Sequence, residues 1–271
     1  MGFVESKKNT ALIERKQVSF NGATTSYLVA GSGKPVVLLH GMGAASGFWH
    51  QVITGLAGGR LVFAPDILGF GRSVPDSPNR PMDFLSWLAG FLDAVGVERA
   101  ALVGHSLGGA IAVRLTLENP DRVEKLVLVG AIGFGASPLG VLAAGLFMVP
   151  SNPVTRPILR RILSVRPDLI PRSPRSKKRK PSFDRGLAMR IMRASGWNGL
   201  PRFPSDTLSR ISKPTLLLWG EKDLVVPVSI ARRMRDDLPH VELQTVSDAG
   251  HMPFMENPTE FCVKLSRFLQ E

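Results

Sequence analysis

The sequence has little of what a disulfide-bonded or metal-dependent protein requires. Cys262 is the only cysteine among 271 residues, which excludes a disulfide within the chain and a cysteine-rich zinc site. The five histidines show no H-E-x-x-H spacing, so we expect neither a metal nor another cofactor. Residues 1–10 contain no apolar run, which argues against a secretory signal and favours a cytoplasmic location.

Charged residues are missing from one part of the chain and concentrated in the next. No charged side chain occurs between Leu126 and Thr155. The net charge is +12, and residues 156–202 account for all of it, with 14 lysines and arginines against Asp168 and Asp184. One inserted element therefore carries the imbalance, while the rest of the chain is neutral.

Strand-like and helix-like segments alternate over most of the chain. Short apolar runs, typical of strands buried on both faces, occupy residues 36–39, 61–64, 100–103, 123–129, 215–219 and 241–246. Helix patterns lie between them, for example over residues 82–95 and after Asn257. Asn21-Gly22 separates two further strand-like segments, which predicts an opening hairpin. The alternation predicts a mostly parallel sheet with helices on both faces.

The alternation stops between residues 133 and 205. Ten prolines in this stretch exclude long strands but permit short helices. We therefore expect residues 1–132 and 206–271 to form the α/β core, and residues 133–205 to form a basic helical cap inserted after the sixth strand. The uncharged residues 131–149 are near the length of a membrane span, but glycines and a proline interrupt them, so a lid helix of about 11 residues is the favoured interpretation.

A nucleophile motif follows one buried strand directly. Gly104-His105-Ser106-Leu107-Gly108 is a G-x-S-x-G between the strand at 100–103 and the helix pattern at 110–117, which is the context this motif needs. The glycines permit a tight strand-to-helix turn that exposes the serine hydroxyl. The alternative is a chance match in a glycine-rich chain. The buried strand before the motif and the helix pattern after it argue against that alternative.

A serine nucleophile needs a base, and the base needs a carboxylate. His251 follows the last strand and precedes the final helix, whereas His50 and His240 lie in segments typical of solvated surface. Asp223 follows the strand at 215–219. With Ser106 and His251 it gives the chain order Ser, Asp, His, which accompanies the G-x-S-x-G motif in hydrolases that have a serine nucleophile. Glu221 and Asp248 are the competing carboxylates.

Two backbone N–H groups should stabilise the oxyanion. Leu107, at the start of the helix after Ser106, supplies one, and Met42, between Gly41 and Gly43, is the candidate for the other. A nucleotide site at this turn is disfavoured, because the third glycine of the dinucleotide fingerprint is missing.

These motifs, with His40-Gly41 and Asp66-Ile67-Leu68-Gly69-Phe70-Gly71-Arg72-Ser73, make residues 24–268 resemble the α/β-hydrolase superfamily in its capped, esterase- or lipase-like form. The resemblance implies an eight-stranded sheet, with Ser106 as nucleophile, Asp223 as acid and His251 as base. We expect the substrate to contact His40, Gly41, His105, Leu139, Leu142 and Phe147.

The favoured function is hydrolysis of a small-molecule carboxylic ester with an apolar acyl group. Hydrolysis of a carbon–carbon bond in a ring-cleavage product is the first alternative, although such relatives often have asparagine before the nucleophile and Gly-Pro-Gly in the oxyanion loop, where His105 and Gly43-Ala44-Ala45 stand here. Lactone opening and perhydrolysis stay open. A non-catalytic ligand receptor is disfavoured because Ser106, Asp223 and His251 are all present. Serine at the turn excludes epoxide opening and halide removal, because relatives with those activities use aspartate there.

Lys177-Lys178-Arg179-Lys180 forms the most basic part of the cap. A solvated, mobile loop is one interpretation. The other is that the apolar lid and this cluster dock together on an anionic membrane surface, which would give a peripheral location. We expect no nucleic-acid partner, because no aromatic residues interleave the basic run. The sequence does not indicate an oligomeric state.

Overall fold

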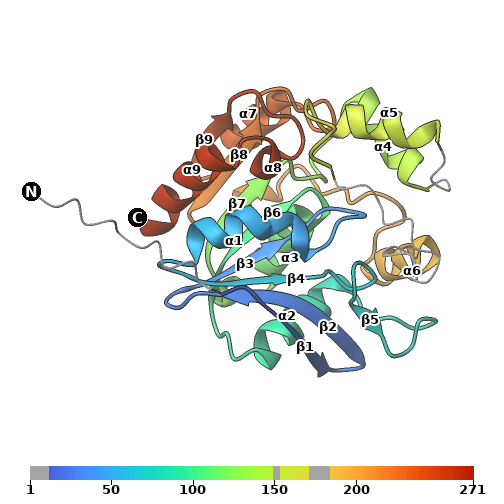
Figure 1. The fold of residues 1–271 in the computed structure, drawn as a ribbon, viewed down its shortest axis with the longest axis vertical. Helices are drawn as coiled ribbons and strands as arrows, with labels where there is room; N and C mark the ends of the chain where they lie inside the picture. The colour runs from blue at the N-terminus through green and yellow to red at the C-terminus, as the bar shows by residue number, and fades with distance from the viewer. Residues whose placement is uncertain (1–11, 149–152, 171–183) are drawn as a thin grey trace, which may run out of the picture.

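A central sheet with helices on both faces organises the protein (Figure 1). The computed structural model describes residues 12–148, 153–170 and 184–271. Eight strands form a continuous sheet in the order β1-β2-β4-β3-β6-β7-β8-β9. Their bounds are β1 Glu14–Phe20, β2 Ala23–Ala30, β3 Pro35–Leu39, β4 Leu61–Pro65, β6 Ala100–His105, β7 Val123–Val129, β8 Thr215–Gly220 and β9 Val241–Val246.

The pairing confirms the predicted fold class. β1, β2 and β4 pair antiparallel, and every other neighbouring pair along the continuous sheet is parallel. The predicted hairpin is β1 and β2, which turn at Asn21 and Gly22, both with positive φ. The two-residue strand β5, Val74–Pro75, pairs with β2 beside this path and was not predicted.

Alternate residues of the strands bury against two separate helix layers. Val36 and Leu38 of β3 face a core that includes residues of α1 His50–Leu56, α8 Pro253–Glu256 and α9 Pro258–Gln270. Val37 and Leu39 face a core with α2 Phe84–Ala94, α3 Leu107–Glu118 and α7 Val228–Asp237. Strands buried on both faces therefore read as continuous apolar runs. In the described ranges, short 3₁₀ helices connect these elements: η1 Ser46–Trp49, η2 Pro120–Arg122 and η3 Leu208–Arg210.

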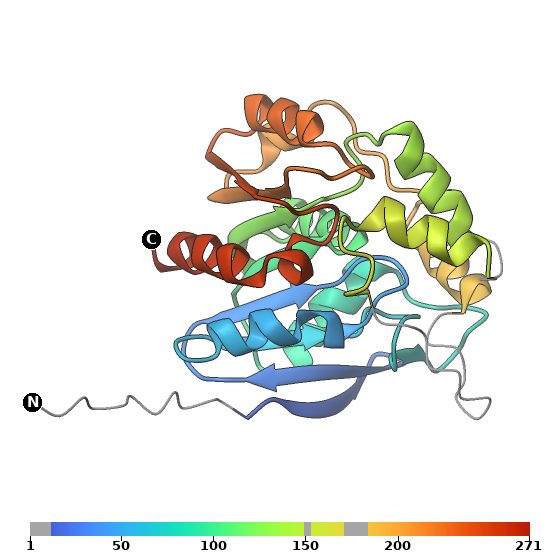
Figure 2. The same cartoon turned by 45° about the horizontal axis from the view of Figure 1, so that its top comes forward.

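Helices lie between β7 and β8, in and after the segment predicted as a cap. Among the residues described there, the α-helices are α4 Pro138–Met148, α5 Thr155–Leu163 and α6 Arg185–Ala194, the 3₁₀ helix η3 follows them, and no strand occurs. Figures 1 and 2 both show α4, α5 and α6 grouped on the side of the molecule opposite the C-terminus. Across the described ranges, no helix is long and apolar enough to cross a membrane. Lys177-Lys178-Arg179-Lys180 lies outside the described residues.

Candidate active site

Ser106 sits at a strained turn between β6 and α3. Its φ of 52° and ψ of −114° place a non-glycine residue in an unfavourable region, at a cost on the order of 1–3 kcal/mol. The turn is tight enough to require both flanking glycines. A Cβ at Gly104 would lie 2.5 Å from Gly108 O, and one at Gly108 would collide with Leu39 O. The motif therefore folds into the elbow that its glycines predict.

His251 and Asp223 meet in a buried pair behind this elbow. The distance from His251 Nδ1 to Asp223 Oδ2 is 2.9 Å. Asp223 Oδ1 accepts hydrogen bonds from Val225 N at 2.8 Å and Val226 N at 2.9 Å, so the carboxylate is held in one orientation. Because a carboxylate only accepts, His251 Nδ1 carries the proton and Nε2 is left to accept another.

The competing carboxylates have other partners. Asp248 pairs with Lys222 Nζ at 2.6 Å on the surface, and the hydrogen bond and charge of Lys222 lower the pKa of Asp248. Glu221 accepts from Thr245 Oγ1 at 3.2 Å. In the described part of the chain, His251 contacts neither of them.

His105 supports the loop that carries His251. Its Nε2 lies 2.8 Å from His251 O, and the two ring centroids are 4.7 Å apart. Burial, reinforced by the neighbouring His251, holds the pKa of His105 well below its ordinary value. The neutral ring must therefore donate through Nε2–H, since a carbonyl oxygen can only accept.

His40 bonds to the backbone through both ring nitrogens, which the sequence did not predict. Its Nδ1 donates to Gly41 O at 2.8 Å, and its Nε2 accepts from Ile67 N at 2.9 Å. Burial lowers the pKa of His40, in keeping with this neutral form. Both ring nitrogens are thus used to fix the loop before Met42.

In the part of the chain that the structure describes, the two backbone N–H groups expected at the oxyanion have no protein acceptor, and Met42 lines the cavity that Ser106 lines. Among the described residues, neither Met42 N nor Leu107 N donates to a protein acceptor. Leu107 begins α3, so its N–H belongs to the group of helix N-terminal donors without an intrahelical partner.

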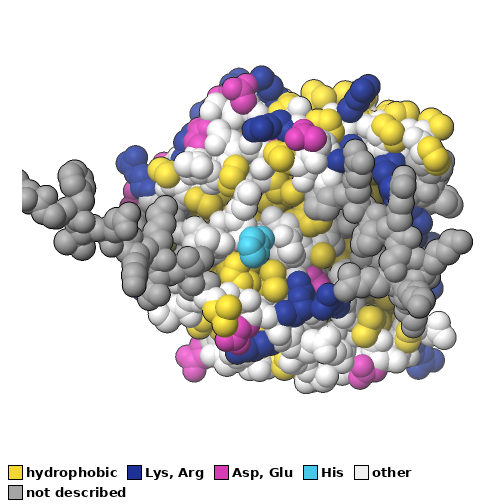
Figure 3. Space-filling model, in the orientation of Figure 1, with side chains coloured by type: hydrophobic (Ala, Val, Ile, Leu, Met, Phe, Trp, Pro, Cys, Tyr) yellow, Lys and Arg dark blue, Asp and Glu magenta, His cyan; other side chains and the backbone are white. Residues whose placement is uncertain are grey.

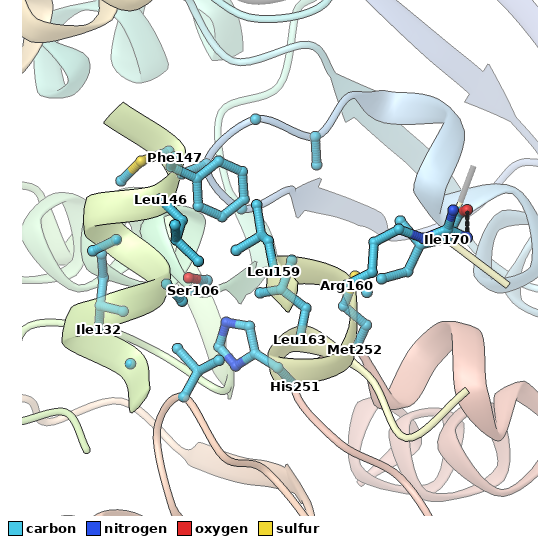
Figure 4. Close-up of a pocket in the computed structure, with 18 of the residues that line it drawn as sticks. Ser106, Ile132, Leu146, Phe147, Leu159, Arg160, Leu163, Ile170, His251 and Met252 are labelled. Atoms are coloured by element: carbon cyan, nitrogen blue, oxygen red, sulfur yellow. Dashed lines mark hydrogen bonds between the residues drawn. The ribbon is translucent and has the colours of Figure 1, made fainter. Parts of the chain in front are cut away.

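Ser106 and His251 line the same cavity, which has a volume of about 530 Å³. Figure 4 shows both at its wall, with Leu146 and Phe147 from α4 and Leu159 and Leu163 from α5. No acidic side chain lines it within the described ranges. The hydrogen bond that the His251 ring makes among the described residues is with Asp223, not with Ser106 Oγ. Catalytic hydrogen bonds are often long until a substrate is bound.

Three of the six expected substrate contacts are at the cavity and three are not. Gly41, His105 and Phe147 line it. His40 does not, because its ring is buried behind the loop; Leu139 and Leu142 do not, because they point outward from α4 and are exposed. The inward positions of α4 include 140, 143, 144 and 147. Since α4 is apolar all round, its sequence did not reveal which face is buried.

Residues that join the segment between β7 and β8 to the His251 loop were not predicted from the sequence. His251 N donates to Leu163 O, at the end of α5, at 3.1 Å. The buried carboxylate of Glu256 accepts from Gly250 N and from Ser164 Oγ. The apolar spacing of Leu159, Ile162 and Leu163 in α5 is the one sequence signal that could have placed this helix against the cavity.

The family described as alpha/beta hydrolase fold matches residues 34–258, most of the chain. The chain belongs to this family. The α/β-hydrolase is 30% identical over 254 residues to a 2-hydroxy-6-oxo-6-phenylhexa-2,4-dienoate hydrolase of Comamonas testosteroni, with 87% of each chain covered.

Two solved structures are similar to this α/β-hydrolase. A carboxylesterase of Bacillus subtilis superposes with a TM-score of 0.76 and 25% identity, covering 95% of this chain and 92% of that one. A bacterial membrane phospholipase A has a TM-score of 0.74 and 28% identity, covering 98% of this chain and 88% of that one. The similarities confirm the fold and support hydrolase activity.

Proposed function

We propose that the protein is a serine hydrolase that cleaves carboxylic esters with an apolar acyl group through an acyl-enzyme intermediate. The hydrogen bond between His251 Nδ1 and Asp223 Oδ2 carries this proposal. It fixes the imidazole tautomer, and it leaves Nε2 free to act as a base toward a serine on the same cavity.

The proposed reaction has two halves. Ser106 Oγ attacks the ester carbonyl carbon while His251 Nε2 takes its proton; the Met42 and Leu107 N–H groups stabilise the oxyanion. His251 then returns the proton to the departing alcohol, which leaves Ser106 acylated. A water molecule then attacks the acyl group while His251 takes one of its protons, and His251 gives this proton to Ser106 Oγ as the acyl–oxygen bond breaks and the acid leaves. Each oxyanion donor of this kind contributes about 100- to 1,000-fold in rate.

The cavity supports an apolar acyl group. Leu146, Phe147, Leu159 and Leu163 supply apolar walls from two cap helices. The similarity to a carboxylesterase and to a membrane phospholipase A, both named for ester cleavage, points the same way.

Carbon–carbon bond hydrolysis is the second candidate, and the Comamonas relative favours it. The dienoate in that relative's name carries a carboxylate. Here two arginines of the cavity wall direct donors at backbone carbonyls: Arg185 Nε at Phe147 O, 2.9 Å away, and Arg160 Nη2 at Ile170 O, 2.7 Å away. Arg156 lines the cavity as well, and Arg160 Nε is buried without a hydrogen-bond partner among the described residues, so donors that suit a carboxylate are present and support this second candidate. Lactone opening and perhydrolysis would use the same three side chains.

A substrate panel tests the proposal. Purified protein is assayed with p-nitrophenyl esters of graded acyl length and, separately, with 2-hydroxy-6-oxo-6-phenylhexa-2,4-dienoate. We expect ester turnover and phosphonate labelling of Ser106, both lost in Ser106→Ala with the fold intact. Turnover of the dienoate alone would assign the second candidate, and undiminished turnover by Ser106→Ala would overturn the nucleophile.

A further inference from the structure

The outward side of the cap helices exposes large apolar side chains. Leu139, Val141 and Leu142 on α4 are 41%, 61% and 47% exposed, and Val154 and Ile158 at α5 are 70% and 44% exposed. We call these five residues the α4–α5 face. Figure 3 shows hydrophobic side chains gathered over these two helices. A surface helix normally presents polar residues to water, and contiguous apolar patches mark interaction sites.

Positive charge accompanies this face. α5 carries no acidic residue and α4 carries no charge; of the arginines of α5, Arg156 and Arg160 line the cavity and Arg161 lies on the outward side. Arg161 is exposed, and it lies three residues after Ile158 and seven after Val154, on the same side of the helix. In Figure 3, basic side chains border the apolar region. Apolar and cationic side chains on one side are the combination that binds anionic lipid surfaces.

The face and the cavity are two sides of the same wall. Gly140, Ala143 and Phe147 of α4, with Leu159 and Leu163 of α5, line the cavity that holds Ser106 and His251. The same two helices turn the α4–α5 face outward. A bilayer in contact with this face would therefore lie directly beside the cavity.

We propose that the α4–α5 face docks on the surface of an anionic phospholipid bilayer, and that the cavity takes an acyl ester of a lipid from it. The substrate part of this inference rests on the proposed ester hydrolysis, whereas the docking part does not. Charge complementarity selects the bilayer over a second copy of the chain, because a symmetric dimer through this face would bring the two Arg161 side chains together.

Vesicle co-sedimentation tests the docking. The full-length protein is mixed with vesicles of phosphatidylglycerol and phosphatidylcholine, or of phosphatidylcholine alone, at low and high salt. Val141→Gln/Ile158→Gln removes apolar contact on both helices, and Arg161→Gln removes one charge. The matched control, Val74→Gln/Val263→Gln, changes two valines that are 51% and 65% exposed on β5 and α9.

We expect binding to the anionic vesicles that falls with salt and is at least tenfold weaker for phosphatidylcholine alone. Val141→Gln/Ile158→Gln should weaken it about tenfold or more and Arg161→Gln about fivefold, with the control unchanged. Hydrolysis of p-nitrophenyl butyrate, which needs no bilayer, should be the same in all variants.

Three outcomes would overturn the docking: no binding by the unchanged protein, equal binding by Val141→Gln/Ile158→Gln, or a concentration-dependent dimer that this variant dissociates. The last would assign the face to a second copy. If the protein binds vesicles but hydrolyses no ester, the proposed function fails and the docking stands. If it hydrolyses p-nitrophenyl butyrate without binding vesicles, only the docking fails. Arg161→Gln and the salt dependence keep the test decisive if the double variant does not fold.

Discussion

His105 Nε2 donates a hydrogen bond to the backbone carbonyl oxygen of His251, 2.8 Å away. The residue directly before Ser106 thereby fixes the loop that carries the proposed base, although the two are 146 positions apart. His105 also packs edge-on against Phe254, whose centroid is 5.0 Å away, so its ring has one orientation. The elbow and the His251 loop are coupled through a neutral, buried imidazole.

Replacing His105 should therefore loosen this loop. His105→Leu removes the donor and leaves a buried carbonyl oxygen unpaired, which should lower the free energy of unfolding by about 1–3 kcal/mol. We expect kcat to fall at least tenfold with a smaller change in KM. His105→Gln, which retains an N–H donor, should recover part of both losses. Urea unfolding and ester kinetics measure the two effects; equal values for the Leu and Gln variants would contradict the role of the hydrogen bond.

The buried histidines also predict how stability depends on pH. Burial lowers the pKa of His40 and of His105, so both are neutral in the folded protein. In the unfolded chain a histidine binds a proton below about pH 6.5, so the unfolded state takes up more protons as pH falls. The free energy of unfolding should be fully retained above pH 6.5 and decrease below it, by up to about 1.4 kcal/mol per pH unit for each histidine.

Urea unfolding at pH 8, 7, 6 and 5 checks this dependence. His105→Gln should give a shallower decrease between pH 6.5 and 5, since one of the two linked groups is gone. His240→Gln, at an exposed position, is the control and should follow the unchanged protein. A decrease that is equally steep in His105→Gln would show that His105 does not contribute.

The same substitution at Asp223 and at Asp248 tests which of the two is the acid. Asp223→Asn should reduce kcat by about 100- to 10,000-fold, because the amide no longer fixes the imidazole tautomer or stabilises its charge. Asp248→Asn loses only a surface ion pair, and asparagine tolerates the φ of 50° found there, so kcat should be unchanged. Steady-state kinetics separate them. A large effect of Asp248→Asn with none from Asp223→Asn would reassign the acid.

Two glycines differ in what surrounds them. Gly108→Ala would place a Cβ against the carbonyl oxygens of Leu39 and His40, so we expect the elbow to be displaced, with several kcal/mol lost and little activity left. Gly145 on α4 has open space around it, and Gly145→Ala should stabilise by up to about 1 kcal/mol. Thermal unfolding of both variants is the measurement; a fully stable Gly108→Ala would contradict the close approach.

Local patterns in the sequence predicted most of the core. The strand runs, the opening hairpin and the final helix are found where the patterns place them, because each depends on short-range periodicity and turn residues. The elbow at Ser106 was equally predictable. Its two glycines are required by backbone atoms that are either a few residues away in the sequence or on the neighbouring strand β3. The order Ser, Asp, His then predicted which loops carry the acid and the base.

Other features depend on contacts between distant segments. α4 has no polar side to orient it, so its sequence could not show that Leu139 and Leu142 face outward while Phe147 faces the cavity. Nor could it show that His40 holds a backbone loop, or that Glu256 bridges Gly250 and Ser164.

The amino-acid sequence by itself determined the sheet, the elbow and the choice of candidate side chains, because these follow from residue spacing and backbone sterics. Only the tertiary structure decided which carboxylate meets His251, which side of the cap forms the cavity wall and which side is left to solvent. The physical reason is that burial and hydrogen bonding are properties of segments packed together, and a uniformly apolar helix or a lone buried acid acquires its role only from its neighbours.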